Sequence, residues 1–224
     1  MFGPELFAFL DQLARNNRRE WFQANRSRFE EDVRAPVLRF IEAFAPRLHR
    51  ISDRFVADSR PSGGSMFRIH RDTRFSRDKS PYKTWVAVQF RHVQGRDVHS
   101  PGFYLHIQPG NTFAGAGLWH PDRTVLAQVR EAIADTPDRW RHAVGGRTFR
   151  ARFERTGDAL KRVPRGFPAD HPAADELRRK DFIALTRFDD DELFATTFLT
   201  SLAGRFRLAV PMMQFLTNAM ALPW

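Results

Sequence analysis

Residues 65–85 of the chain read SMFRIHRDTRFSRDKSPYKTW and continue directly into the apolar stretch VAVQF at positions 86–90. From Arg68 to Lys83, six basic residues stand against two acidic ones, a local excess of four positive charges. Successive side chains of an extended chain point to opposite faces. The polar face of this stretch would carry Arg68, His70, Asp72 and Arg74. The other face would carry Phe67, Ile69, Thr73 and Phe75 together with Arg71. One face can therefore build a core while the other meets a ligand.

The residue pattern from position 66 onward predicts a run of strands with short connections. Alternating polar and apolar positions predict strands over 66–75 and 84–93, joined by a loop over 76–83. Two further strands are expected over 103–108 and 112–121, with turn signals between them. Neighbouring strands with such short links favour antiparallel pairing.

Two of these expected strands carry side chains, or gaps between side chains, that point to a site. In residues 103–108 (FYLHIQ), Tyr104 and His106 alternate with apolar residues and are expected on the outward face. In TFAGAGLWHP, Gly115 and Gly117 remove the side chains from one face. Glycines inside a strand often mark a place where a ligand or another backbone comes close.

The chain ends are predicted to be helical. Residues 4–15 have apolar side chains at the three-and-four spacing of an amphipathic helix. Asn17, with Glu20 three residues later, is typical of a cap for a second helix, which the apolar pattern extends to about residue 48. Pro36 is expected to kink or break that helix because proline lacks a backbone donor. Trp21, Asn25 and Arg26 are interpreted as the helix rim in preference to a site.

The remaining sequence alternates between helical and extended patterns. It predicts helix from 122 through Trp140, a strand over 147–153, a short helix over 171–180, a last strand over 181–188 and mostly helix over 190–217. The expected fold class is α+β: a mainly antiparallel central sheet flanked by N-terminal and C-terminal helices. We expect a single domain over 1–224, with N-terminal helices about 4–50, the sheet core about 65–120 and the other elements about 122–220.

Composition narrows the class of protein further. The 224 residues are 42% hydrophobic and include 22 Phe, which is enough for a core, and the absence of cysteine excludes disulfides and thiolate metal sites. We find neither a signal peptide nor an apolar run long enough to span a membrane, so a cytoplasmic protein without a membrane partner is expected. The net charge of +10 suits an anionic partner.

Residue choice in the central motif departs from the rest of the chain. The sequence uses Arg almost everywhere, yet two of its four lysines, Lys79 and Lys83, lie in the motif. Both tyrosines, Tyr82 and Tyr104, lie in or near it, although Phe is the usual aromatic residue of this chain. These choices indicate that ammonium and hydroxyl groups are used there.

The segment RDTRFSRDKSPYK, with NNRREWFQANR before it and PGFYLHIQPG and GAGLWHP after it, resembles an uncharacterised family of microbial proteins with a domain of unknown function. The resemblance covers most of the chain. It implies a single-domain protein in a cytoplasmic, chiefly bacterial setting. It brings no catalytic residues, and the cofactor and the oligomeric state stay open.

Familiar enzyme motifs are missing from the sequence. Gly115 and Gly117 begin a G-x-G-x-x-G pattern, but His120 occupies the third glycine position, and no GKS or GKT follows a glycine run. There is no G-x-S-x-G elbow and no H-E-x-x-H. Dinucleotide binding, P-loop chemistry and these two hydrolase classes are therefore not supported.

The first of the remaining interpretations is a basic, aromatic-lined pocket for a small anion that bears phosphate or carboxylate, in a protein that could be an enzyme. Charge-assisted hydrogen bonds from Arg and Lys hold such groups. The ligand-binding candidates are Arg68, His70, Arg71, Asp72, Arg74, Lys79, Tyr104 and Trp119. The catalytic candidates are Tyr82, Lys83 and His106, with Lys83 on the anion and Tyr82 orienting or protonating the ligand.

Three alternatives stay open. The motif could be a structural brace whose charges pair with one another, although its two acids cannot neutralise six cations without help from residues such as Glu30. His70, His106 and His120 with Asp72 could hold a metal, but nearby cations oppose this, and no metal is expected. The runner-up is nucleic-acid binding, in which the basic surface meets phosphates and aromatic side chains such as Trp119 stack on bases.

Overall fold

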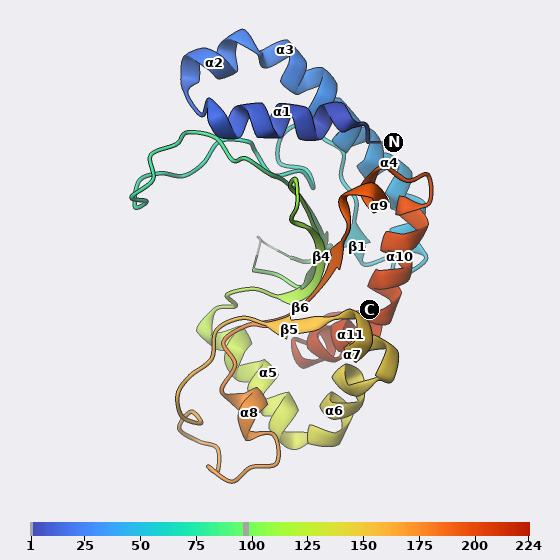
Figure 1. Cartoon of the computed structure of the whole chain (residues 1–224). Helices are drawn as coiled ribbons and strands as arrows, with labels where there is room; N and C mark the ends of the chain where they lie inside the picture. The colour runs from blue at the N-terminus through green and yellow to red at the C-terminus, as the bar shows by residue number, and fades with distance from the viewer. Residues whose placement is uncertain (1, 96–98) are drawn as a thin grey trace.

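The computed structural model describes residues 2–95 and 99–224 and shows an α+β architecture (Figure 1). Within those residues, six strands form one sheet in the order β1-β2-β3-β4-β6-β5, and each neighbouring pair is antiparallel. The strands are β1 Phe55–Val56, β2 Val86–His92, β3 Gly102–Ile107, β4 Thr112–Leu118, β5 Glu154–Thr156 and β6 Phe182–Phe188. The predicted fold class is confirmed.

Helices precede the sheet, follow it and occupy the connections from β4 to β5 and from β5 to β6. In the N-terminal part they are α1 Pro4–Arg15, α2 Arg19–Ala24, α3 Arg26–Arg28, the π-helix η1 Phe29–Arg34 and α4 Ala35–His49. The rest are α5 Arg123–Asp135, α6 Pro137–Gly145, α7 Arg147–Arg152, α8 Ala174–Leu177, α9 Asp190–Phe194, α10 Phe198–Leu208 and α11 Val210–Ala219. The predicted first helix is confirmed residue for residue.

The two faces of the sheet differ, and the alternation in β2 and β3 explains why. Val88 pairs with Leu105, and Phe90 pairs with Phe103, on the face that α4 and α10 cover. There the Phe103 and Phe206 ring centroids lie 4.6 Å apart. Burial of one such side chain contributes roughly 1.5–3 kcal/mol. The opposite face looks into the space between the N-terminal helices and α5 to α8 (Figure 1).

The long second helix is more irregular than its apolar pattern predicted. It is divided into α2, α3, the π-helix and α4. Pro36 lies in the first turn of α4, where a missing N–H costs little. The π-helical turns end immediately before that first turn, and such wider turns are frequent near functional sites.

Asn17 has a different role from the cap that the sequence predicted. The cap residue of α2 is Arg18. The Asn17 side chain instead pairs with the backbone of Tyr82: its amide nitrogen donates to the Tyr82 carbonyl at 2.9 Å, and its oxygen accepts from the Tyr82 N–H at 3.0 Å. Asn17 therefore joins the start of the helical region to the central motif.

The predicted strand over 66–75 is wrong. This segment is a loop that forms two isolated bridges with the described residues, Met66 to Val88 and His70 to Tyr82, and no continuous ladder with them. Backbone bonds from the Lys83 N–H to the Ile69 carbonyl and from the Phe67 N–H to the Ala87 carbonyl, 2.8 and 2.9 Å long, fasten it beside β2. Beyond these points the chain leaves the sheet, and Phe75 is 95% exposed.

Other elements also differ from those predicted from the sequence. Residues 147–153 were expected as a strand, but 147–152 form α7, and its buried Phe149 packs on Phe153, the residue that follows the helix. The short helix expected over 171–180 is limited to α8. The short strands β1 and β5 were not predicted, because two or three residues carry too little alternation to detect.

Asn17→Ala should loosen the joint between the helices and the central motif. It removes two hydrogen bonds and leaves two partly buried backbone groups of Tyr82 without that partner, so we expect a loss of about 2 kcal/mol in the free energy of unfolding. Urea unfolding measures this. Asn16→Ala is the matched control: with the described residues, the Asn16 side chain makes a single, exposed hydrogen bond to the Gln12 carbonyl, so its loss should change stability by less than about 0.5 kcal/mol. Equal effects of the two variants would contradict the assigned role.

Candidate functional site

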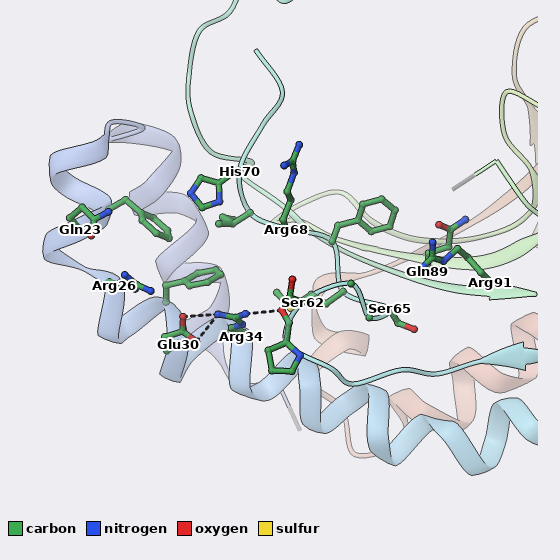
Figure 2. Close-up of a pocket in the computed structure, with 18 residues that line it drawn as sticks. Gln23, Arg26, Glu30, Arg34, Ser62, Ser65, Arg68, His70, Gln89 and Arg91 are labelled. Carbon is green, nitrogen blue, oxygen red and sulfur yellow. Dashed lines mark hydrogen bonds and ion pairs between the residues drawn. The ribbon is translucent and has the colours of Figure 1, made fainter. Parts of the chain in front are cut away.

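A cleft of about 560 Å³ lies between the N-terminal helices, the loop over 61–70 and strand β2 (Figure 2). We call it the basic cleft. Its charged and polar residues include Arg26, Glu30, Arg34, Arg68, His70, Gln89 and Arg91. Four arginines face one glutamate there, an excess of three positive charges. The three contributing segments are far apart in sequence, so the cleft exists only in the folded chain.

Within the basic cleft, one ion pair is internal. Arg34 Nη1 lies 3.0 Å from Glu30 Oε1, and Arg34 Nη2 donates to the Pro61 carbonyl at 2.7 Å (Figure 2). Among residues 2–95 and 99–224, neither Arg26 nor Arg68 forms a salt bridge through its guanidinium. These two groups keep donors available for an oxyanion, which a guanidinium can bind through two parallel hydrogen bonds.

A second hollow of about 410 Å³ lies on the sheet face that α4 and α10 leave open. We call it the aromatic cavity. Its walls include Phe67, Trp85, Tyr104, Phe113 and Trp119, and its floor includes Gly102, Gly115 and Gly117. Tyr104 pairs with Gly115, and Gly102 pairs with Gly117, so the floor spans two adjacent strands.

The two glycines that β4 contributes to the floor of the aromatic cavity differ in what a side chain would meet. Gly117 has φ of 132°, and a Cβ there would lie 1.9 Å from the Phe182 carbonyl oxygen. Any side chain would therefore clash with the backbone. At Gly115 a Cβ would lie 3.0 Å from Leu185 Cδ2, a close contact with a flexible side chain, and it would also raise the floor. The glycine pattern in the sequence thus corresponds to a close backbone approach at Gly117 and to an open surface at Gly115.

The two hollows are neighbours with common walls. Phe67 and Gln89 line both of them. Lys83 lines neither hollow but contacts residues that do: its ammonium is 5.6 Å from the Phe67 ring and 5.1 Å from the Trp85 ring, and it donates to the Arg68 carbonyl at 2.6 Å. Burial lowers the pKa of Lys83, and the nearby charge of Arg68 adds to this effect.

A chain of polar groups runs along the edge of the aromatic cavity. The Tyr104 hydroxyl lies 3.3 Å from His106 Nδ1, and His106 Nε2 lies 2.9 Å from Gln108 Oε1. Burial raises the pKa of Tyr104 well above its usual range and lowers the pKa of His106, despite the bond to Gln108. A neutral ring that donates from Nε2 to Gln108 and accepts at Nδ1 from the Tyr104 hydroxyl fits both contacts.

The structure divides the sequence-based candidates into groups. Arg68 and His70 line the basic cleft, and Tyr104 and Trp119 line the aromatic cavity. His106 is at the edge of that cavity, with its ring stacked 4.6 Å from Phe113 and lying 5.0 Å from Trp85. Ala87, which pairs with His106, shares its face of the sheet with Gln89, and Gln89 lines both hollows.

The remaining motif residues lie away from both hollows. Tyr82 is 3% exposed, and its ring stacks on Phe22 at 4.1 Å. The expectation that Tyr82 and Lys83 present a phenol and an ammonium side by side is therefore not met, because consecutive residues of an extended segment point to opposite sides. The other four line neither hollow: Arg71, Asp72, Arg74 and Lys79.

Those four residues bond mainly within their own loop. Arg71 pairs with Asp78, Arg74 pairs with Asp72 at 2.7 Å, and Lys79 donates to the Thr73 carbonyl at 2.9 Å. Bonds to Arg74 lower the pKa of Asp72 to about 2. The brace interpretation therefore describes the tip of the loop well, whereas Arg68 is outside it.

The proposed metal ligands are not gathered in one place. His70 packs against Phe22 and Tyr82, His106 contacts Tyr104 and Gln108, and His120 lies 3.6 Å from Asp181. In the described part of the chain, no group of three or more His, Asp or Glu side chains is placed to hold a metal ion.

Several residues that line the basic cleft were not predicted from the sequence as site residues. Glu30 was considered only as a possible partner for the motif cations, and Arg26 was assigned to the helix rim, yet both line the basic cleft. Arg34 and Arg91 gave no signal, since each is one of many arginines in the chain. A pattern within one segment cannot show that charges from helix, loop and strand converge.

The structure thus defines a class: an α+β protein with one helix-covered sheet face, an aromatic cavity on the other face and a basic cleft beside that cavity. The chain belongs to the family described as conserved hypothetical protein (DUF2461), whose model matches residues 5–215. Neither the curated proteins nor the solved structures yielded a match. Over the described residues, every helix is too short or too polar to cross a membrane.

The lowered pKa of His106 has a consequence for stability. The ring is harder to protonate in the folded chain than in the unfolded chain, whose ordinary pKa is 6.5. The unfolded state therefore gains its proton first as the pH falls, and the free energy of unfolding should decrease below about pH 6.5. His106→Gln should flatten that part of the profile. Denaturant unfolding at a series of pH values measures this, and an unchanged slope in the variant would contradict the assignment.

Proposed function

We propose that the protein binds a small anionic ligand, one that bears a phosphate or carboxylate, in the basic cleft. The excess of three positive charges among the residues that line the cleft is the observation that carries this proposal. Like charges that face one hollow repel one another, so an anion that neutralises them gains favourable interactions with all of them. The volume of about 560 Å³ is within the range of small-molecule sites.

The availability of the cations supports the proposal. Arg34 is held by Glu30 and by the Pro61 carbonyl, whereas Arg26 and Arg68 have no salt bridge among the described residues. The carbonyl of Ile69, the residue after Arg68, accepts a hydrogen bond from the Lys83 N–H. The backbone at Arg68 is therefore held in place before a ligand binds. A preorganised cation loses less entropy when it binds an anion than one on a free loop.

The protein has too few acidic side chains in the cleft to pair with all of its arginines. The one acid of the cleft, Glu30, is already engaged by Arg34. The acids of the motif are engaged elsewhere, since Asp72 pairs with Arg74 and Asp78 pairs with Arg71. Arg68 is near enough to Asp72 for its charge to help lower the pKa of that carboxyl, but it forms no salt bridge among the described residues, so its guanidinium can bind a ligand anion.

Arg68→Ala tests the proposal with pyrophosphate as the probe. Arg68 is exposed and makes no side-chain ion pair with the described residues, so the fold should keep its stability. Loss of a charge-assisted contact should weaken pyrophosphate binding about tenfold in calorimetric titrations at low salt. Arg74→Ala is the matched control: it removes an arginine of the same motif that pairs with Asp72 outside the cleft. Equal affinity of the two variants would contradict the assignment.

Salt separates this proposal from nucleic-acid binding. A protein that contacts several phosphates of duplex DNA loses affinity steeply as salt rises. The logarithm of its binding constant falls with the logarithm of the salt concentration, with a slope of about −0.9 per phosphate contacted. We expect no such binding by this protein. Tight, salt-sensitive binding of duplex oligonucleotides without any binding of pyrophosphate would overturn the small-anion proposal in favour of nucleic acid.

Lys83→Met separates a ligand-binding role from a bracing role. The methionine keeps an apolar chain against Phe67 and Trp85 but removes the ammonium beside Arg68. If Lys83 contacts the anion, pyrophosphate affinity should fall about tenfold and stability by no more than about 1 kcal/mol. A loss of roughly 3 kcal/mol with unchanged affinity would show that Lys83 only braces the loop.

A further inference from the structure

The aromatic cavity is a second surface of a different chemical kind beside the basic cleft. Aromatic rings form its walls, and the glycine floor exposes the flat backbone of β3 and β4. Removal of Cβ atoms lets a planar group approach the sheet, while ring walls favour stacked or edge-on contacts with another ring. The cavity therefore fits a planar aromatic group better than a branched aliphatic one.

The position of the charges connects this cavity to the cleft. Arg91 of the basic cleft pairs in the sheet register with Gly102 of the cavity floor. On the other side, Lys83 holds its ammonium over Trp85 and Phe67, which both line the cavity. A ring on the glycine floor would thus have cations on two sides, at the border with the cleft.

We propose that the ligand is a phosphate ester with a planar aromatic ring, the phosphate in the basic cleft and the ring in the aromatic cavity. This inference rests on the proposed anion site and adds the chemical class of its ligand. Three excess positive charges suit a phosphate dianion better than a single carboxylate. Nucleotides and riboflavin 5′-phosphate share this chemistry, so both serve as probes.

The cavity can be altered without disturbing the core. Trp119 is 49% exposed, so its replacement by Leu removes a wall ring with little loss of buried area. Gly115→Ala places a methyl group on the floor, where only the flexible Leu185 side chain has to move. Phe75→Leu is the matched control, because Phe75 is also an exposed aromatic residue but lies outside both hollows.

The test compares adenosine 5′-monophosphate and riboflavin 5′-phosphate with ribose 5-phosphate, which lacks the ring, by calorimetric titration. We expect at least one ring-bearing probe to bind about tenfold more tightly than ribose 5-phosphate, as stacking on aromatic side chains predicts. Trp119→Leu and Gly115→Ala should remove this advantage and leave ribose 5-phosphate binding unchanged. Arg68→Ala should weaken all three probes, and Phe75→Leu none.

The outcomes separate this inference from the proposal on which it rests. If ribose 5-phosphate binds as tightly as both ring-bearing probes, the anion site stands and the aromatic half is overturned. If no phosphate probe binds, the proposed function fails as well. If a 5′-phosphorylated oligonucleotide binds more than tenfold more tightly than adenosine 5′-monophosphate, the ligand is a nucleic-acid strand and the small-ligand inference is overturned.

Discussion

The paired hydrogen bonds between the Asn17 side chain and the Tyr82 backbone are the constraint on which the site depends. An amide side chain has both donor and acceptor groups, so Asn17 can pair with the Tyr82 N–H and carbonyl as a neighbouring strand would, while His70 forms the bridge to Tyr82. The Tyr82 ring, stacked on Phe22, closes the same joint from the core side. Together these contacts set the N-terminal helices against the central motif, and the basic cleft is the space left between them.

Strands β2, β3 and β4 give the two faces of the sheet opposite tasks. One set of alternate residues, such as Phe90 and Phe103, packs under the helices. The alternate residues on the other face include Gln89, Tyr104 and the floor glycines, and they line the aromatic cavity. Because side chains alternate strictly in a strand, a register shift of one residue would exchange these tasks and destroy core and site together. The packing of the core therefore fixes the position of the floor.

Much of the fold was readable in the sequence because its signals are local. The alternation in FYLHIQ predicted β3, and Gly115 and Gly117 marked the later cavity floor. Residues 66–75 alternate equally well, yet a strand needs a continuous partner, which the loop lacks beyond His70. The cleft itself was out of reach, since Arg26, Arg34 and Arg91 come from segments that meet only after folding. Tyr82 shows the same limit: its unusual hydroxyl suggested chemistry, but its ring serves the core.

At Gly115, a residue with a side chain would stabilise the strand but would also fill the floor of the aromatic cavity. Glycine inside a strand costs roughly 0.5–1 kcal/mol relative to alanine, because the unfolded chain loses more freedom when it folds. Its φ is not in the left-handed region, and only a flexible side chain lies near its missing Cβ, so a larger residue has room to be accepted. Selection for heat resistance alone would fill this position and erase the hollow. Natural or laboratory lineages of this fold that retain glycine there under thermal selection would reveal a pressure other than stability.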